Sequence, residues 1–210
     1  MEGSPRRMLM SEDRTPGTSR AGGKRPGEEA PLRIAVVGGS QPSEEELVLA
    51  EALGRALGEA GAVVITGGLG GVMEAASRGC AGAGGTTVGF LPGSDPATAN
   101  PWVRLPLPSG MGEARNALVV RSGEAVVAVG GSWGTLSEIA LARAMGIPVA
   151  LLGSPPADLP LPRLGTGEEG AAWALQVAKG RRGTRSAVLP PGKEGTRGSR
   201  RRGGPMSFPQ

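Results

Sequence analysis

Short apolar runs alternate along the middle of the chain with longer segments that have the periodicity of amphipathic helices. The runs are rich in β-branched residues and are bounded by glycine, proline or polar residues, as is typical of strands buried on both faces of a sheet. They lie at residues 34–37, 62–66, 86–91, 125–129 and 147–152, with a brief additional strand at 102–105. The segments between them predict helices at residues 43–60, 72–83, 111–121 and 168–178, and a further helix that follows Thr135. This alternation predicts an α/β fold in which right-handed βαβ units build a parallel sheet with helices on both faces.

Two of the expected helices begin with a capping-box signature, in which Ser or Thr precedes Glu by three residues. Ser43 and Glu46 form the first signature, and Thr135 and Glu138 form the second. In a capping box the hydroxyl and the carboxylate accept hydrogen bonds from backbone N–H groups at the start of the helix. The pattern therefore predicts a structural role for Glu138 that competes with any role in function.

Glycines follow three of the predicted strands at their carboxyl ends. The three corners contain Gly38, Gly39 and Ser40; Gly67, Gly68, Gly70 and Gly71; and Gly130, Gly131, Ser132, Gly134 and Thr135. One such corner is explained equally well by the geometry of a tight turn. Three of them at the ligand-binding edge of an open α/β sheet favour a phosphate site, where glycine permits close approach to the backbone and a helix N-terminus offers N–H groups. The corners match neither the dinucleotide fingerprint nor the P-loop.

The charge distribution divides the chain into three parts. Residues 1–32 carry six basic and five acidic side chains with little apolar material, and residues 179–210 carry nine basic residues and one acid. We expect both segments to be disordered. Residues 33–178 contain eight basic and thirteen acidic residues and are expected to form the one folded domain. The basic tail could contact nucleic acid or anionic lipid without specificity, but a solubilising extension is the favoured interpretation, so no specific nucleic-acid partner is predicted.

The composition excludes several classes of site. The chain has no histidine, so a His-based triad, an imidazole general base and a His-containing metal site are excluded, and we predict no metal site. Any acid–base chemistry falls to carboxylates, and any anion binding to arginine and backbone. No apolar run approaches the ~18 residues of a membrane span, and the lone Cys80 cannot form an intramolecular disulfide. We therefore expect a cytoplasmic protein without a membrane partner.

Residues 33–178 resemble the Rossmann-like family that includes the LOG-type nucleotide phosphoribohydrolases and the molybdenum cofactor carrier proteins. The resemblance rests on IAVVGGS, TGGLGGVMEAASRG and EARNALVVRSGEAVVAVGGSWGTLSEIALA, in this order. It implies a Rossmann-like fold and a homo-oligomer, either a dimer or a tetramer.

The hydrolase branch of this family carries paired motifs, M-x-x-R-K and P-G-G-x-G-T-x-x-E. The second aligns with the segment from Gly130 to Glu138, with Gly130 in place of proline and Ser132 in place of the second glycine. The first is matched loosely, with Arg115 one residue later than expected after Met111 and with asparagine at position 116 in place of lysine. These departures favour the carrier branch over hydrolysis.

The resemblance implies two main functions for one site. The first is a carrier that binds a phosphorylated pterin, the molybdenum cofactor, with no other cofactor required. The second is a nucleoside 5′-monophosphate phosphoribohydrolase, in which Glu138 stabilises positive charge on the ribose and orients water while Arg115 holds the phosphate or the ribose hydroxyls. A nucleotide sensor is a third, weaker hypothesis. The expected ligand-binding residues are Gly38, Gly39, Ser40, Gly67, Gly68, Gly70, Gly71, Arg115, Asn116, Gly131, Ser132, Gly134 and Thr135, and the catalytic residues of an enzyme would be Glu138 and Arg115.

Overall fold

The computed structural model describes residues 29–155 and 157–188. Most of the N-terminal extension expected to be disordered, residues 1–28, and the tail from residue 189 lie outside the described residues. The last helix, expected at residues 168–178, is longer than predicted and spans Gly167–Val188. The first ten residues of the predicted tail are therefore helical.

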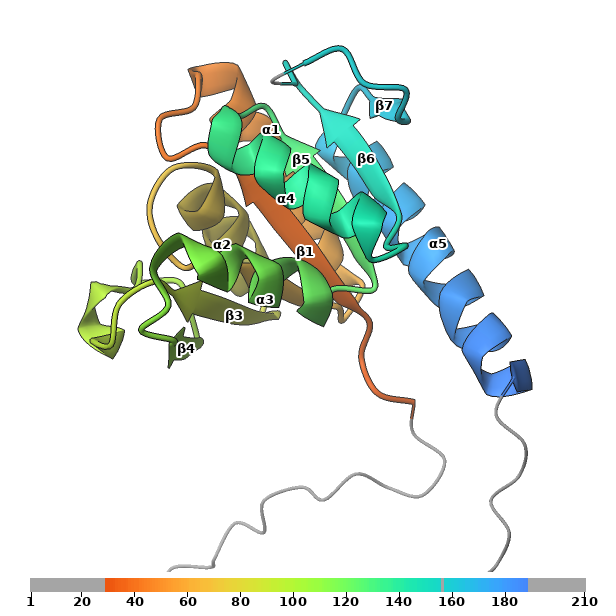
Figure 1. Cartoon of the computed structure of the whole chain (residues 1–210), viewed down its shortest axis with the longest axis horizontal. Coiled ribbons are helices and arrows are strands. Elements are labelled where there is room, and N and C mark those ends of the chain that lie inside the picture. The colour runs from red at the N-terminus through yellow and green to blue at the C-terminus, as the bar shows by residue number, and fades with distance from the viewer. Residues whose placement is uncertain (1–28, 156, 189–210) are drawn as a thin grey trace, which may run out of the picture. The chain divides into compact units, whose positions relative to one another are not determined.

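The described residues form one sheet with helices on both sides (Figure 1). The strands are β1 Arg33–Gly38, β2 Val63–Thr66, β3 Thr86–Leu91, β4 Leu105–Pro108, β5 Ala125–Val129, β6 Val149–Leu152 and β7 Arg163–Leu164. The helices are α1 Glu44–Glu59, α2 Val72–Gly82, α3 Asn116–Ser122, α4 Trp133–Ala144 and α5 Gly167–Val188, with 3₁₀ turns η1 Pro96–Thr98 and η2 Gly112–Arg115. Five predicted strands are confirmed, the brief strand lies three residues later than predicted as β4, and β7 was not predicted.

All pairings in the sheet are parallel, which confirms the predicted fold class. The strand order is β4-β3-β2-β1-β5-β6-β7. The chain moves outward from β1 to β4 on one side and then returns to place β5 beside β1. The direction of winding therefore reverses between β1 and β5, and at such a switch point the loops at the carboxyl ends of the strands diverge and leave a crevice.

Each central strand is buried on both faces, as the continuous apolar runs predicted. Ile34 and Val36 of β1 pack with α1, α2 and α5, whereas Ala35 and Val37 pack with α3 and α4. The alternation follows from the two-residue period of a strand. The buried Cys80 belongs to the first of these clusters, and burial raises the pKa of its thiol to about 11. None of the helices in the described ranges is both long and apolar enough to cross a membrane.

Candidate functional site

A cleft of about 650 Å³, counting its open mouth, lies at the switch point between β1 and β5. It brings together ten residues of the predicted site: Gly38, Gly39, Ser40, Gly67, Arg115, Asn116, Ser132, Gly134, Thr135 and Glu138. They come from the loops after β1, β2 and β5, from the junction of η2 and α3, and from α4. The two residues that the resemblance singled out for catalysis, Arg115 and Glu138, therefore line the same cleft.

Arg115 is a buried cation in the wall of this cleft. It is 5% exposed, and its Nε is buried without a hydrogen-bond partner among the described residues. The predicted helix over residues 111–121 is divided at this point, because Arg115 ends the 3₁₀ turn η2 and Asn116 begins α3. An unsatisfied donor on a buried charged group is costly, which makes this guanidinium a strong candidate for binding an anion.

Glu138 lies in α4, is 7% exposed and also lines the cleft. Burial raises the pKa of its carboxyl to about 7, the positive charge of Arg115 opposes this shift, and the negative charge of Glu113 adds to it. Glu138 and Arg115, both among the described residues, form no direct ion pair. The site therefore holds a carboxyl group that can gain or lose a proton near neutral pH beside a fixed positive charge.

The predicted capping box of Thr135 and Glu138 is wrong. The helix α4 begins at Trp133 with Ser132 as its N-cap, so Thr135 and Glu138 are both inside the helix. Residues three apart share a helix face, and both side chains are buried against the cleft. Glu138 has no capping role that would compete with a functional one. The other predicted box, Ser43 with Glu46, is confirmed by hydrogen bonds of 3.2 and 3.0 Å.

The first turn of α4 is a potential anion-binding element. Ser132 makes no side-chain capping hydrogen bond to it. Backbone N–H groups in the first turn of a helix have no partner within the helix, and the positive end of the helix dipole lies beside them. Ser132, Gly134 and Thr135 from this turn line the cleft that also contains Arg115. The cleft therefore combines a helix N-terminus, glycine backbone and a buried arginine.

Residues 31–173 of the chain match the model of the SLOG cluster4 family. The chain belongs to this family, which is part of the LOG and lysine-decarboxylase-like superfamily. It is also 40% identical over 124 residues to an uncharacterized protein of Archaeoglobus fulgidus, a match that covers 59% of this chain and 82% of the relative. The resemblance inferred from the motifs is confirmed at the level of the superfamily.

Two solved structures of molybdenum cofactor proteins are similar to this SLOG cluster4 protein. The molybdenum cofactor binding protein of Rippkaea orientalis is 32% identical with a TM-score of 0.67, and the match covers 71% of this chain and 99% of that one. The molybdenum cofactor carrier protein of Chlamydomonas reinhardtii is 31% identical with a TM-score of 0.64, with the same coverage.

The glycine at position 130, where the hydrolase motif has proline, is required by the backbone of this SLOG protein. Gly130 has a φ of +51°, whereas the proline ring holds φ near −65°. Its N–H also donates a 2.9 Å hydrogen bond to the carbonyl of Leu152, which proline could not make. The departure from the motif is therefore tied to the shape of the turn after β5.

Four predicted ligand-binding glycines of the SLOG domain do not line this cleft: Gly68, Gly70, Gly71 and Gly131. Gly68 and Gly71 have positive φ values, and a Cβ at Gly71 would lie 2.5 Å from the carbonyl oxygen of Gly39. These two residues shape the loop before α2. Gly131 faces an adjoining hollow that it shares with Gly39, Ser40 and Ser132.

The cleft is also lined by five residues that the sequence patterns do not predict as site residues: Val36, Val37, Leu69, Met73 and Glu113. Glu113 changes the electrostatics of the site, because its negative charge acts on Glu138. It lies two residues before Arg115 in the segment EARN, and this closeness to Arg115 is the sequence feature that could have identified it as a site residue. The four apolar residues carried no such signal, because apolar residues beside a glycine corner are equally expected in the core.

Proposed function

We propose that this SLOG protein binds a small phosphorylated ligand in the cleft at the switch point, and that it serves as a carrier of a pterin of the molybdenum cofactor type. The phosphate contacts Arg115, and the first-turn N–H groups of α4 stabilise its charge. Arg115 is the observation that carries the proposal, because a nearly buried guanidinium with an unpartnered Nε lines a cleft rich in glycine backbone. An anion there supplies the missing acceptor.

The residues around Arg115 suit a phosphorylated pterin. Asn116 is 8% exposed, and its amide offers both donors and an acceptor for the edge of a heterocycle. The hydroxyls of Ser40 and Ser132 line the same cleft. The likeness to the carrier protein of Chlamydomonas reinhardtii, whose length the chain covers almost completely, supports this choice of ligand. The molybdenum cofactor is then cargo that the protein protects and releases.

A second candidate function, hydrolysis of nucleoside 5′-monophosphates, is favoured by the position of Glu138. This carboxyl group lies in the cleft with Arg115 and is not used in capping. In the ionised form it would orient a water molecule and stabilise the positive charge that develops on the ribose as the N-glycosidic bond breaks. The water oxygen bonds to the ribose carbon, and the base leaves with a proton.

The first experiment measures binding of the purified 210-residue chain to the molybdenum cofactor and to adenosine 5′-monophosphate. Arg115→Gln should weaken binding of the preferred ligand by roughly tenfold or more, because one charged hydrogen bond contributes about 1.5–3 kcal/mol. Arg104→Gln is the matched control, because this exposed arginine does not line the cleft. Equal affinities of the two variants would contradict the proposed site.

The second experiment separates a carrier from an enzyme. A carrier returns the ligand unchanged, as mass spectrometry of released ligand would show. An enzyme releases ribose 5-phosphate from nucleoside monophosphates, and Glu138→Gln should then lower turnover by about two orders of magnitude while binding persists. Turnover by the wild-type protein that Glu138→Gln abolishes would replace the carrier proposal with the hydrolase. Turnover that Glu138→Gln leaves intact would exclude Glu138 as the catalytic group.

A further inference from the structure

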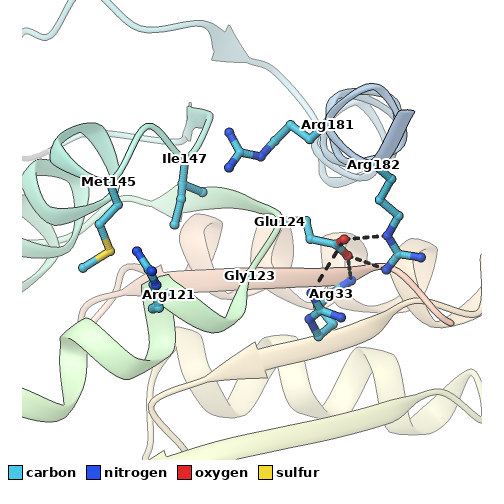
Figure 2. Close-up of a pocket in the computed structure, with 8 residues that line it drawn as sticks. All are labelled: Arg33, Arg121, Gly123, Glu124, Met145, Ile147, Arg181 and Arg182. Atoms are coloured by element: carbon cyan, nitrogen blue, oxygen red, sulfur yellow. Dashed lines mark hydrogen bonds and ion pairs between the residues drawn. The ribbon is translucent and has the colours of Figure 1, made fainter. Parts of the chain in front are cut away.

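A second hollow lies at the amino-terminal ends of the strands, on the opposite side from the cleft (Figure 2). Arg33 is the first residue of β1, Glu124 directly precedes β5, and Ile147 precedes β6. The hollow measures about 640 Å³, counting its open mouth. The cleft with Arg115 opens at the carboxyl ends of the strands, so the two sites share no lining residue.

Four arginines and one carboxylate line this hollow. Arg33 comes from β1, Arg121 from α3, and Arg181 and Arg182 from α5. Glu124 is the acidic residue among the described lining residues, which gives the lining side chains a net charge of +3. This concentration of positive charge contrasts with the acidic composition of residues 33–178. It is assembled by tertiary packing, because Arg33, Arg121 and the adjacent pair Arg181–Arg182 lie far apart in the sequence.

Glu124 holds two of the arginines in place. Its Oε2 accepts a 2.9 Å hydrogen bond from the backbone N–H of Arg33 and a 2.6 Å hydrogen bond from Nη2 of Arg182. Burial alone would raise the pKa of Glu124, but the hydrogen bonds from Arg182 and Arg33 and the charges of both arginines hold it below its ordinary value. Glu124 is therefore ionised at neutral pH and anchors α5 to the start of β1. These contacts form part of the wall of the hollow.

The other two arginines, among the described residues, form no ion pair with Glu124. Figure 2 shows Arg121 and Arg181 reaching into the hollow from different elements, with Ile147 between them. Nη1 of Arg181 donates a hydrogen bond to the carbonyl of Gly146. The side chain of Arg121 is exposed and makes no hydrogen bond or ion pair within the part of the chain that the structure describes. Two guanidinium groups on a preformed frame can each offer paired N–H donors to phosphate oxygens.

We propose that this hollow binds a small ligand that carries a diphosphate group. The net charge of the lining is balanced by the roughly three negative charges of a bound diphosphate, and separate arginines can contact the two phosphates. Met145 and Ile147 offer an apolar wall to the organic part of the ligand. A nucleic-acid strand fits less well, because none of the lining residues is aromatic and single-stranded nucleic acid is usually held by base stacking on aromatic side chains. This site is independent of the function proposed for the cleft.

The test is a calorimetric titration of the full chain with inorganic pyrophosphate at moderate ionic strength. Arg121→Gln and Arg181→Gln should each weaken the affinity about tenfold or more. Arg104→Gln, which removes an exposed arginine that lines neither site, should leave this binding event unchanged. Thermal unfolding of each variant without ligand shows whether it retains the wild-type fold. Arg121→Gln is the more informative variant, because the Arg121 side chain makes no hydrogen bond or ion pair among the described residues that the substitution would break.

Four outcomes would overturn the proposal. Absence of pyrophosphate binding at millimolar concentration is the first. The second is loss of binding in Arg115→Gln with no change in Arg121→Gln, which would assign the ligand to the cleft. The third is an equal loss in Arg104→Gln or in Arg201→Gln of the basic tail, which would indicate general electrostatic attraction. The fourth is displacement of pyrophosphate by a short single-stranded oligonucleotide that binds more tightly, which would indicate a nucleic-acid surface.

Discussion

The guanidinium of Arg115 lies directly against the backbone of Gly67. A Cβ at position 67 would stand 2.0 Å from Nη1 of Arg115 and 2.7 Å from its Cζ. Gly67 follows β2 and Arg115 precedes α3, so this contact joins two loops at the carboxyl edge of the sheet. Because Gly67 has no side chain, there is room for the guanidinium of Arg115 beside the cleft.

Gly67→Ala should impair phosphate-ligand binding without removing any charge. The new methyl group must displace the guanidinium of Arg115, and we expect affinity for the preferred ligand to fall by roughly tenfold. Binding of adenosine 5′-monophosphate or of the molybdenum cofactor provides the measurement. Gly70→Ala in the same loop is the matched control, because a Cβ there would meet only Oε2 of Glu74 at 3.8 Å. Similar losses in the two variants would contradict the assigned role of Gly67.

Glu138 should make the protein less stable as pH rises through neutrality. Burial raises its pKa in the folded protein to about 7, compared with 4.5 as its ordinary value. The folded state therefore binds this proton more tightly than the unfolded state, which adds to the free energy of unfolding. This contribution is present in full below the ordinary pKa and is lost as the pH rises toward and through the pKa in the folded protein. The full contribution of this proton to the free energy of unfolding is on the order of 3 kcal/mol.

The free energy of unfolding of Glu138→Gln, measured between about pH 5 and pH 8, tests this pH dependence. The wild-type protein should lose stability relative to the variant across this interval. Glu59→Gln, a substitution of an exposed residue at the end of α1, serves as the control for a neutralised surface carboxylate. Parallel pH profiles of the wild type and Glu138→Gln would show that Glu138 does not titrate in this range.

Gly130→Pro, which restores the proline of the hydrolase motif, should destabilise the protein by about 3 kcal/mol or more. The substitution imposes an incompatible φ and removes the hydrogen bond to the Leu152 carbonyl. Chemical denaturation measures the loss. Gly82→Ala at the end of α2 is the control, because a Cβ there would meet nothing within 4 Å. A Gly130→Pro protein as stable as the wild type would show that the turn after β5 is not constrained in this way.

We predict that the protein self-associates through the outer face of α4. Trp133 is 85% exposed at the start of this helix, and Leu136, Ile139 and Leu159 line an apolar hollow along it. Burial of such a surface against a second copy is favourable. Ala140→Glu should convert the oligomer to monomer in light scattering, whereas Val48→Glu on the exposed side of α1 should not. A wild-type monomer at micromolar concentration would contradict the prediction.

Local patterns in the sequence predicted most of the sheet and part of the lining of the cleft. The β-branched run Ala125–Val129 is a strand buried on both faces, because an apolar side chain at every position leaves no face for water. The glycine corners lie at one edge of the sheet because parallel strands all point the same way. Arg115 and Glu138 were recognised from short motifs, and the structure places both in one cleft.

The start of α4 shows where a local pattern was insufficient. Thr135 and Glu138 have the spacing of a capping box, yet Gly130 and Gly131 turn the chain at φ values of +51° and +112°, and helical backbone begins directly after Ser132. Both residues therefore lie on a buried helix face. The spacing alone could not distinguish a capping box from two residues on the same face, because both arrangements use a separation of three.

The sequence by itself determined the order of the helices and of strands β1 to β6 along the chain, the parallel sheet and the glycine-rich ends of its strands, because the period of apolar residues reports directly which faces are buried. Only the tertiary structure decided that Arg115 rests on Gly67 and that Glu124 holds Arg33 and Arg182 together. It also showed that the last helix continues past residue 178, which places Arg181 in the hollow that Arg121 lines. These relationships join residues far apart in the chain, and they depend on how helices pack on the sheet, which no local period encodes.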